Sequence, residues 1–182
     1  MIIGLTGRMA AGKGTVADLL KARGFQYHSL SDVIRTVARD RGLETSRENL
    51  TRIGNELRAE GGPSVLGDRV LAWLEPGVDY VIDSIRNPAE VDALAAGRGD
   101  FVMVCVDAPA SVRFERLTAR GRTGDVQTLD EFEAQEAREL VTDDPRTQQL
   151  LATEAKATHR IDNGSGLASL EASVERLIAS LA

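Results

Sequence analysis

The feature that most constrains this chain is its first stretch, MIIGLTGRMAAGKGT, residues 1–15. The apolar run Met1–Leu5 predicts a buried strand and the periodic pattern of Lys13–Arg23 predicts a helix, so the glycine-rich residues 7–12 join the two. Glycines allow a backbone to curl until several N–H groups face one anion, and the helix N-terminus adds the positive end of its dipole. With the mobile charge of Lys13, the stretch predicts a phosphate-binding loop; a strand-to-helix turn that binds nothing is the alternative.

The length and charge of the chain limit the kinds of protein it can be. Its 182 residues, 42% of them hydrophobic, suffice for one well-buried core, which predicts a single domain over residues 1–182. A net charge of −6 argues against a nucleic-acid partner, which needs a broad cationic surface. No apolar run has membrane-spanning length and the apolar start is too short for a signal peptide, so we expect a cytoplasmic protein with no membrane partner. A monomer and a homodimer are both compatible with the sequence.

Short apolar runs alternate with helical patterns along the chain. The three clearest runs are each followed by a turn and a helical pattern rather than by a hairpin, which predicts parallel strands. The sequence therefore predicts an α/β fold in which a parallel five-stranded sheet carries helices on both faces. The predicted strands are Met1–Leu5, Gln26–His28, Tyr80–Ile82, Phe101–Val106 and His159–Ile161, and the predicted helices are Lys13–Arg23, Asp32–Arg41, Arg47–Glu60, Ser64–Leu74, Pro88–Ala96, Ala110–Arg120, Asp130–Leu140, Pro145–Ala155 and Leu167–Leu181.

The residues that follow the loop lysine indicate which kind of phosphate-binding protein the chain resembles. Lys13 is followed by Gly14, and the hydroxyl of Thr15 comes one place later than in switch GTPases, which use that hydroxyl to hold magnesium. The sequence Gly-Lys-Gly-Thr resembles the loop ending of adenylate kinase-like nucleoside monophosphate kinases, which have the P-loop NTPase fold. The resemblance implies ATP and Mg²⁺ as cofactors, with the ion reaching Thr15 and Asp83 partly through water. It also implies that the ATP phosphates are held by Gly7, Ala10, Ala11, Gly12, Lys13, Gly14 and Thr15.

The segment after the first helix, HSLSDVIR, resembles the start of the acceptor-binding region of the same kinases. Its Asp32 and Arg35 fall at the acidic and arginine positions, and a guanidinium presents forked donors to phosphate oxygens. The resemblance implies an acceptor-binding arm over residues 32–75, in which Arg58 is a candidate for a second contact to the acceptor phosphate. The alternatives are that Ser31 or Asp32 caps a helix and that the arginines lie on a solvated face.

Asp83 follows the apolar run Tyr80–Ile82, at the edge where open parallel sheets place their ligands. This makes Asp83 a candidate to orient Mg²⁺ or its waters. The stretch resembles the adenylate kinase signature Asp-Gly-Phe-Pro-Arg, with Arg86 as an acceptor contact. However, Ser84 replaces the glycine, the Phe-Pro pair is absent and the arginine comes one residue early, which weakens the case for an adenine-nucleotide acceptor. The alternative is that Asp83 caps the helix beginning near Pro88.

Arginines gather again after the strand Phe101–Val106. Arg116 and Arg120 lie on one face of the predicted helix, and Arg122 follows in a glycine-bracketed turn. The stretch resembles a short kinase lid over residues 116–145, in which these arginines stabilise the charge of the transferring phosphate and Arg120 also contacts ATP. Ion pairs within the lid are the alternative.

The turn near the C-terminus completes the resemblance. Asn163 and Gly164 match the turn that passes the ATP base in nucleotide kinases and dephospho-coenzyme A kinases, although a plain strand-to-helix turn fits equally well. The resemblance implies transfer of the γ-phosphate of Mg·ATP to a small phosphorylated acceptor, foremost a (deoxy)nucleoside monophosphate, by positioning and charge stabilisation. The alternatives are a dephospho-coenzyme A kinase, whose loop usually reads Gly-Lys-Ser, and an ATP-binding regulatory module without an acceptor.

Overall fold

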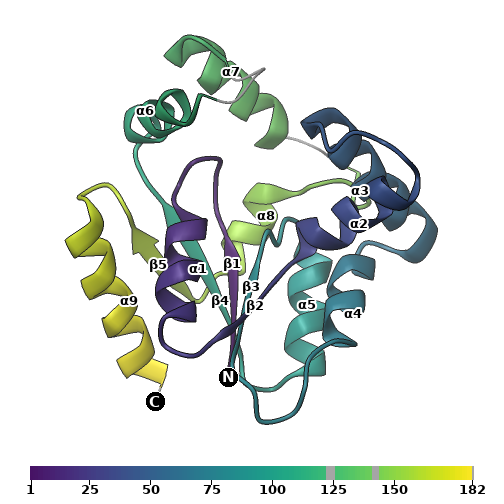
Figure 1. Cartoon of the computed structure of the whole chain (residues 1–182), viewed down its shortest axis with the longest axis horizontal. Coiled ribbons are helices and arrows are strands. Elements are labelled where there is room, and N and C mark those ends of the chain that lie inside the picture. The colour runs from purple at the N-terminus through teal and green to yellow at the C-terminus, as the bar shows by residue number, and fades with distance from the viewer. Residues whose placement is uncertain (122–125, 141–143, 182) are drawn as a thin grey trace.

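The computed structural model describes residues 1–121, 126–140 and 144–181, and within them five strands form one sheet. The strands are β1 (Ile2–Thr6), β2 (Gln26–Ser29), β3 (Tyr80–Asp83), β4 (Phe101–Asp107) and β5 (His159–Asp162). All neighbouring strands run parallel in the order β2-β3-β1-β4-β5, so their carboxyl ends meet at one edge (Figure 1). The predicted parallel five-stranded α/β sheet is confirmed.

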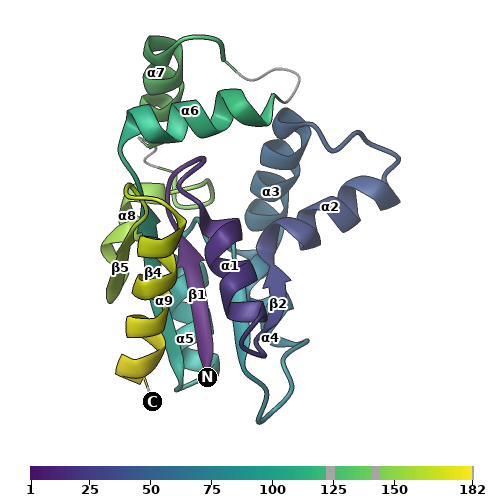
Figure 2. The same ribbon diagram turned by 60° about the vertical axis from the view of Figure 1, so that its left-hand side comes forward.

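Helices cover both faces of this sheet. Figure 2 shows α1 and α9 together over one face, with α2 and α3 standing to one side of the carboxyl-terminal edge and α6 and α7 above it. The helices are α1 (Lys13–Lys21), α2 (Leu30–Asp40), α3 (Arg47–Gly61), α4 (Val65–Leu71), α5 (Pro88–Gly97), α6 (Ala110–Arg120), α7 (Leu129–Leu140), α8 (Leu150–Ala155) and α9 (Leu167–Leu181).

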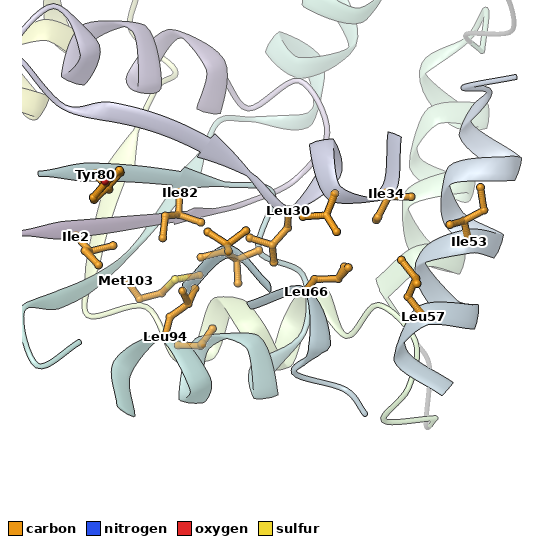
Figure 3. Close-up of a cluster of buried hydrophobic side chains, with 14 of the residues drawn as sticks. Ile2, Leu30, Ile34, Ile53, Leu57, Leu66, Tyr80, Ile82, Leu94 and Met103 are labelled. Atoms are coloured by element: carbon orange, nitrogen blue, oxygen red, sulfur yellow. The ribbon is translucent and has the colours of Figure 1, made fainter. Parts of the chain in front are cut away.

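The strand residues alternate between two hydrophobic cores, because successive side chains point to opposite faces of a sheet. Ile2 and Ile82 join the cluster under α2, α3, α4 and α5 that Figure 3 shows, whereas Ile3 and Val81 join the cluster under α1 and α9. Burying each such side chain contributes about 1.5–3 kcal/mol. The two cores together fix the sheet edge on which the candidate site is built.

The structure corrects two local predictions. The helix predicted over Pro145–Ala155 begins only at Leu150, because residues 145–149 are held in a non-helical path by hydrogen bonds from the loop after β3. The cap of α2 is neither Ser31 nor Asp32: Ser29 occupies the N-cap position, and its hydroxyl accepts from the Ser31 N–H. Both differences come from neighbours that a local sequence pattern does not contain.

No helix among the described residues combines the length and the apolar composition that a bilayer span requires.

Candidate active site

Residues 7–15, here called the phosphate loop, connect β1 to α1 at the carboxyl-terminal edge of the sheet (Figure 1). Gly7 has φ +135°, and a Cβ there would lie 2.0 Å from the Val106 carbonyl oxygen. Gly12 has φ +99°, and a Cβ there would lie 2.0 Å from Nδ2 of Asn163. Both backbone angles favour glycine, and at Gly7 the approach to a backbone oxygen leaves no room for a Cβ.

The middle of the phosphate loop contains a strained alanine and the start of α1 is open. Ala10 has φ +59°, in the left-handed region that disfavours side chains with a Cβ, while Ala11 is completely buried. Gly14 and Thr15 are exposed in the first turn of α1. A phosphate group can therefore approach the helix N-terminus from solvent.

Lys13 is folded back over its own loop. Its Nζ donates to the carbonyl oxygens of Gly7 at 2.7 Å and Arg8 at 3.0 Å. Burial, aided by the positive charge of Arg86, lowers the pKa of Lys13 to about 8, against the opposing attraction of Asp83. The charge of Lys13 therefore responds to one cation and one carboxylate, both from the end of β3 and the segment after it.

Asp83 ends β3 beside Ser29 of β2 and is almost completely buried. Its Oδ1 accepts from the Ser84 N–H, and Ser84 has φ +66°. The alternative that Asp83 caps the following helix is wrong, because Asn87 occupies the N-cap of α5 and forms a capping box with Glu90. Ser84, which replaces the signature glycine, keeps the left-handed backbone that glycine would favour.

Arg86 and the pair Asp32 and Arg35 lie in different surroundings. Arg86 is half-buried, and its Nη1 donates to Oε1 of Gln148 at 3.0 Å. Arg35 donates to Asp32 across 2.8 Å in an exposed pair on α2, where water weakens the attraction. Their predicted contacts with an acceptor stay predictions.

Arg58 is held inside the fold rather than on the surface of the arm. Only 2% of it is exposed, and its Nε and Nη2 donate to Oε1 of Glu90 at 3.0 and 2.7 Å. Its Nη1 is buried without a hydrogen-bond partner among the described residues. The sequence analysis missed Glu90; the signal available was its place three residues after Asn87, the spacing of a capping box. The predicted contact between Arg58 and an acceptor phosphate stays a prediction.

A groove of about 870 Å³ runs between α3 and residues 144–147, and we call it the α3 groove. It lies near the phosphate loop, because Nη1 of its lining residue Arg47 is 2.8 Å from Sδ of Met9. Its second wall is tied to the segment after β3, because the Gln149 N–H donates to the Arg86 carbonyl oxygen at 2.8 Å. The lining residues are Arg47, Glu48, Thr51, Arg52, Asn55, Glu56, Ala59, Asp144, Arg146 and Thr147.

On the other side of the phosphate loop, Arg116 and Asn163 meet. Arg116 donates to the Asn163 carbonyl oxygen at 2.7 Å and to that of Ala11 at 3.4 Å. The Asn163 side chain donates to the same Ala11 carbonyl at 2.9 Å, so it braces the loop, and Gly164 follows in the adjoining turn. Arg120 is exposed at the end of α6. The predicted lid residue Arg122 lies outside the described residues.

A carboxylate from α7 joins the lid to the phosphate loop. Arg113, only 2% exposed, donates to both oxygens of Glu136, which also accepts from Nη1 of Arg8 at 3.2 Å. Arg113 also donates to the Ala108 carbonyl oxygen at 2.8 Å. This ion pair joins α6 to α7 through Arg113, which precedes the predicted lid over residues 116–145, and the sequence analysis missed Arg8 and Glu136 as its partners.

The donor set can be compared with the needs of a magnesium ion. Among the residues that the structure describes, no group of three or more His, Cys, Asp or Glu side chains is placed to hold a metal. Mg²⁺ bound with a nucleotide needs few protein ligands, because phosphate oxygens and water complete its octahedron. Asp83, with the exposed Thr15 hydroxyl, fits such a role.

Comparisons with known proteins agree with this geometry. A family model described as AAA domain matches residues 3–141. The UPF0200 protein of Pyrobaculum aerophilum is 36% identical over 139 residues, covering 76% of this chain and 77% of that protein. The UPF0200 protein of Hyperthermus butylicus is 31% identical over 183 residues, covering 100% and 95%.

Solved structures extend the likeness of the fold. TT1252 from Thermus thermophilus has a TM-score of 0.61 at 22% identity, covering 100% of this chain and 98% of that one. Shikimate kinase from Acinetobacter baumannii, in complex with shikimate, has a TM-score of 0.60 at 17% identity, covering 98% and 93%. At these identities the likeness bears on the fold alone, which is a kinase-like P-loop fold.

Proposed function

Starting from the membership of this chain in the AAA domain family and in the UPF0200 family, we propose that it is an ATP-dependent phosphotransferase acting on a small phosphorylated acceptor. The P-loop domain already implies nucleotide binding. The observation that carries the proposal is the placement of Lys13 and Asp83 at one edge of the sheet, because β1 leads into the phosphate loop and runs beside β3, which ends at Asp83. The α3 groove lies next to this edge, since its lining residue Arg47 contacts Met9 of the phosphate loop. Donor site and acceptor space are then adjacent, as phosphoryl transfer requires.

The residues of the phosphate loop act on the donor. Backbone N–H groups of residues 7–15 and the N-terminus of α1 face the ATP phosphates, and Lys13 exchanges its carbonyl partners for phosphate oxygens. Arg116 and Arg120 add positive charge from α6. Mg²⁺, when bound, supplies further neutralisation of the phosphate charge, with Asp83 and Thr15 orienting it partly through water.

A (deoxy)nucleoside monophosphate is our leading acceptor. The α3 groove of about 870 Å³ lies within the range of pockets that hold molecules of this size. In our proposal Arg86 and Arg35 bind the acceptor phosphate, and Asp32 holds Arg35 through the hydrogen bond between them. The carboxylates among the groove residues complement amino groups or hydroxyls of a base or sugar.

The test is release of ADP from Mg·ATP across a panel of ribo- and deoxynucleoside monophosphates and dephospho-coenzyme A, with a sample lacking acceptor. Strong stimulation by one nucleotide supports the proposal and names the base. Stimulation by dephospho-coenzyme A alone replaces it with the dephospho-coenzyme A kinase alternative. ATP binding with a flat panel contradicts it and favours a regulatory module.

A further inference from the structure

A buried carboxylate lies where three segments of the chain meet. Glu90 of α5 is completely buried, and its two oxygens serve different partners. Oε1 accepts from Nε and Nη2 of Arg58 on α3, and Oε2 accepts from the backbone N–H groups of Arg86 and Asn87 at 3.0 and 3.1 Å. The first two bonds tie α3 to Glu90, and the other two tie Glu90 to the loop that follows β3.

The same loop holds the opposite wall of the α3 groove. The Asn87 side chain donates from Nδ2 to the carbonyl oxygens of Pro145 at 2.7 Å and Thr147 at 2.8 Å. The path from Arg58 through Glu90 and Asn87 to residues 145–147 therefore joins both walls of the groove. We call this path the Glu90 bridge.

Arg58 is the end of the bridge that lies on α3, and only part of its guanidinium is hydrogen-bonded. Two of its three nitrogens share Oε1 of Glu90, which holds the plane of the guanidinium, while Nη1 is left without a partner among the described residues. An unsatisfied buried donor of this kind is unfavourable, and the surrounding contacts hold it in place. Nearby on the same helix, Oδ1 of Asn55, a residue lining the groove, is also buried without a partner in the part of the chain that the structure describes.

We propose that Glu90 is a positioning residue that sets the spacing of the two walls of the α3 groove. At that spacing, one bound acceptor contacts Asn55 and Arg86 at the same time. The proposal rests on the function proposed above for its kinetic consequence, because it takes the groove to be the acceptor site. It assigns Glu90 no contact with the acceptor.

The kinetic test compares Glu90→Gln with Asp92→Asn, a matched loss of one carboxylate charge on the same helix. Asp92 pairs with Lys156 at the surface and takes no part in the bridge. Glu90→Gln is expected to raise the acceptor KM about tenfold while the ATP KM changes less than twofold, because misplacing a binding wall penalises the acceptor alone. Asp92→Asn is expected to leave both unchanged. An unchanged acceptor KM in folded Glu90→Gln overturns the proposal.

A double variant separates positioning from stability. Glu90→Gln leaves the Arg58 charge buried and unpaired, which destabilises the fold, whereas Arg58→Gln/Glu90→Gln removes both charges. The double variant is expected to recover thermal stability while the acceptor KM stays raised. Recovery of both the melting temperature and the acceptor KM would show a purely structural pair and overturn the proposal.

A measurement without turnover distinguishes this proposal from the proposed function. Spin labels at Ala59→Cys and Arg146→Cys report the distance between the walls, and both positions are exposed. Cys105 is buried and its pKa is raised to about 11, mainly by burial, so labelling is confined to the introduced pair. Glu90→Gln is expected to broaden and shift the distance distribution, and an identical distribution overturns the bridge even when no acceptor has been found.

Discussion

The phosphate loop and the α3 groove are built in opposite ways. The loop is one continuous stretch, and its geometry depends on glycine backbone angles and on close approach to Val106 and Asn163. The groove lies between α3 and residues 144–147, and side-chain hydrogen bonds through Glu90 and Asn87 join these two walls. The proposed donor site thus depends on backbone geometry, whereas the proposed acceptor site depends on a buried polar network.

Because of this difference, the phosphate loop and the α3 groove should tolerate different amino-acid substitutions. Backbone N–H groups are present whatever the side chain, so the loop tolerates substitutions that keep its path, and fails where a Cβ is added to Gly7 or Gly12. A buried network fails when one member is lost, because the remaining polar groups stay buried without partners. Substitutions in the two regions should therefore have separable kinetic signatures.

The largest expected effect comes from a substitution that disrupts the phosphate loop and leaves the α3 groove intact. Lys13→Ala removes the charge that neutralises the transferring phosphate, so kcat should fall about 1,000-fold with little loss of stability. Steady-state ADP release and thermal unfolding measure the two quantities. Wild-type turnover in this variant would remove Lys13 from the site.

The next largest effect tests whether the shape of the phosphate loop depends on its glycine backbone angles. Gly7→Ala places a Cβ 2.0 Å from the Val106 carbonyl oxygen at φ +135°, and we expect a loss of about 3 kcal/mol in the free energy of unfolding. Gly14→Ala is the matched control, because a Cβ there meets no described atom within 4 Å. Urea titrations should show destabilisation in the first variant only; equal stabilities would contradict the loop geometry.

Substitution of Arg86 tests the proposed acceptor side of the comparison between the phosphate loop and the α3 groove. Losing one charged hydrogen-bond donor of about 2 kcal/mol should raise the acceptor KM about thirtyfold in Arg86→Ala, with the ATP KM little changed. Initial-rate kinetics in both substrates provide the measurement. If the ATP KM rises instead, Arg86 belongs to the donor site.

A pH titration sharpens the donor side further. The pKa of Lys13 is lowered to about 8, so its charge is present below that pH and is lost above it. Binding a phosphate above this pKa requires uptake of a proton, and the dissociation constant of ATP should rise about tenfold per pH unit above pH 8. Calorimetric titration from pH 7 to 9 measures it, with Lys13→Ala as the control that should lack the dependence. A flat profile in the wild-type protein would contradict the lowered pKa.

The smallest effect concerns the strained alanine. Ala10→Gly should relieve the left-handed φ of +59° and raise the free energy of unfolding by about 0.5–1 kcal/mol without changing the acceptor KM. Thermal and urea unfolding measure the gain. A loss of stability would mean that the entropy of the added glycine outweighs the relief of strain.

Sequence reasoning reached the donor side more fully than the acceptor side. The loop, its flanking elements and the sheet follow from local patterns, and Asp83 follows from its place at the end of a strand. The partner of Arg58 did not follow, because Glu90 lies 32 residues away and its buried pairing depends on how α3 packs on α5. The prediction that residues 145–149 belong to the helix was wrong for the same reason, because their path depends on a hydrogen bond from Asn87.

By itself the sequence determined the elements of this protein, their parallel arrangement and the phosphate loop, since hydrophobic period and glycine placement act over a few residues. Only the tertiary structure decided which charges meet. It directed Arg58 to Glu90, Arg113 and Arg8 to Glu136, and the Asn163 side chain to the loop. The physical reason is that a buried charge needs a partner in space, and the partner is supplied by whichever element packs against it.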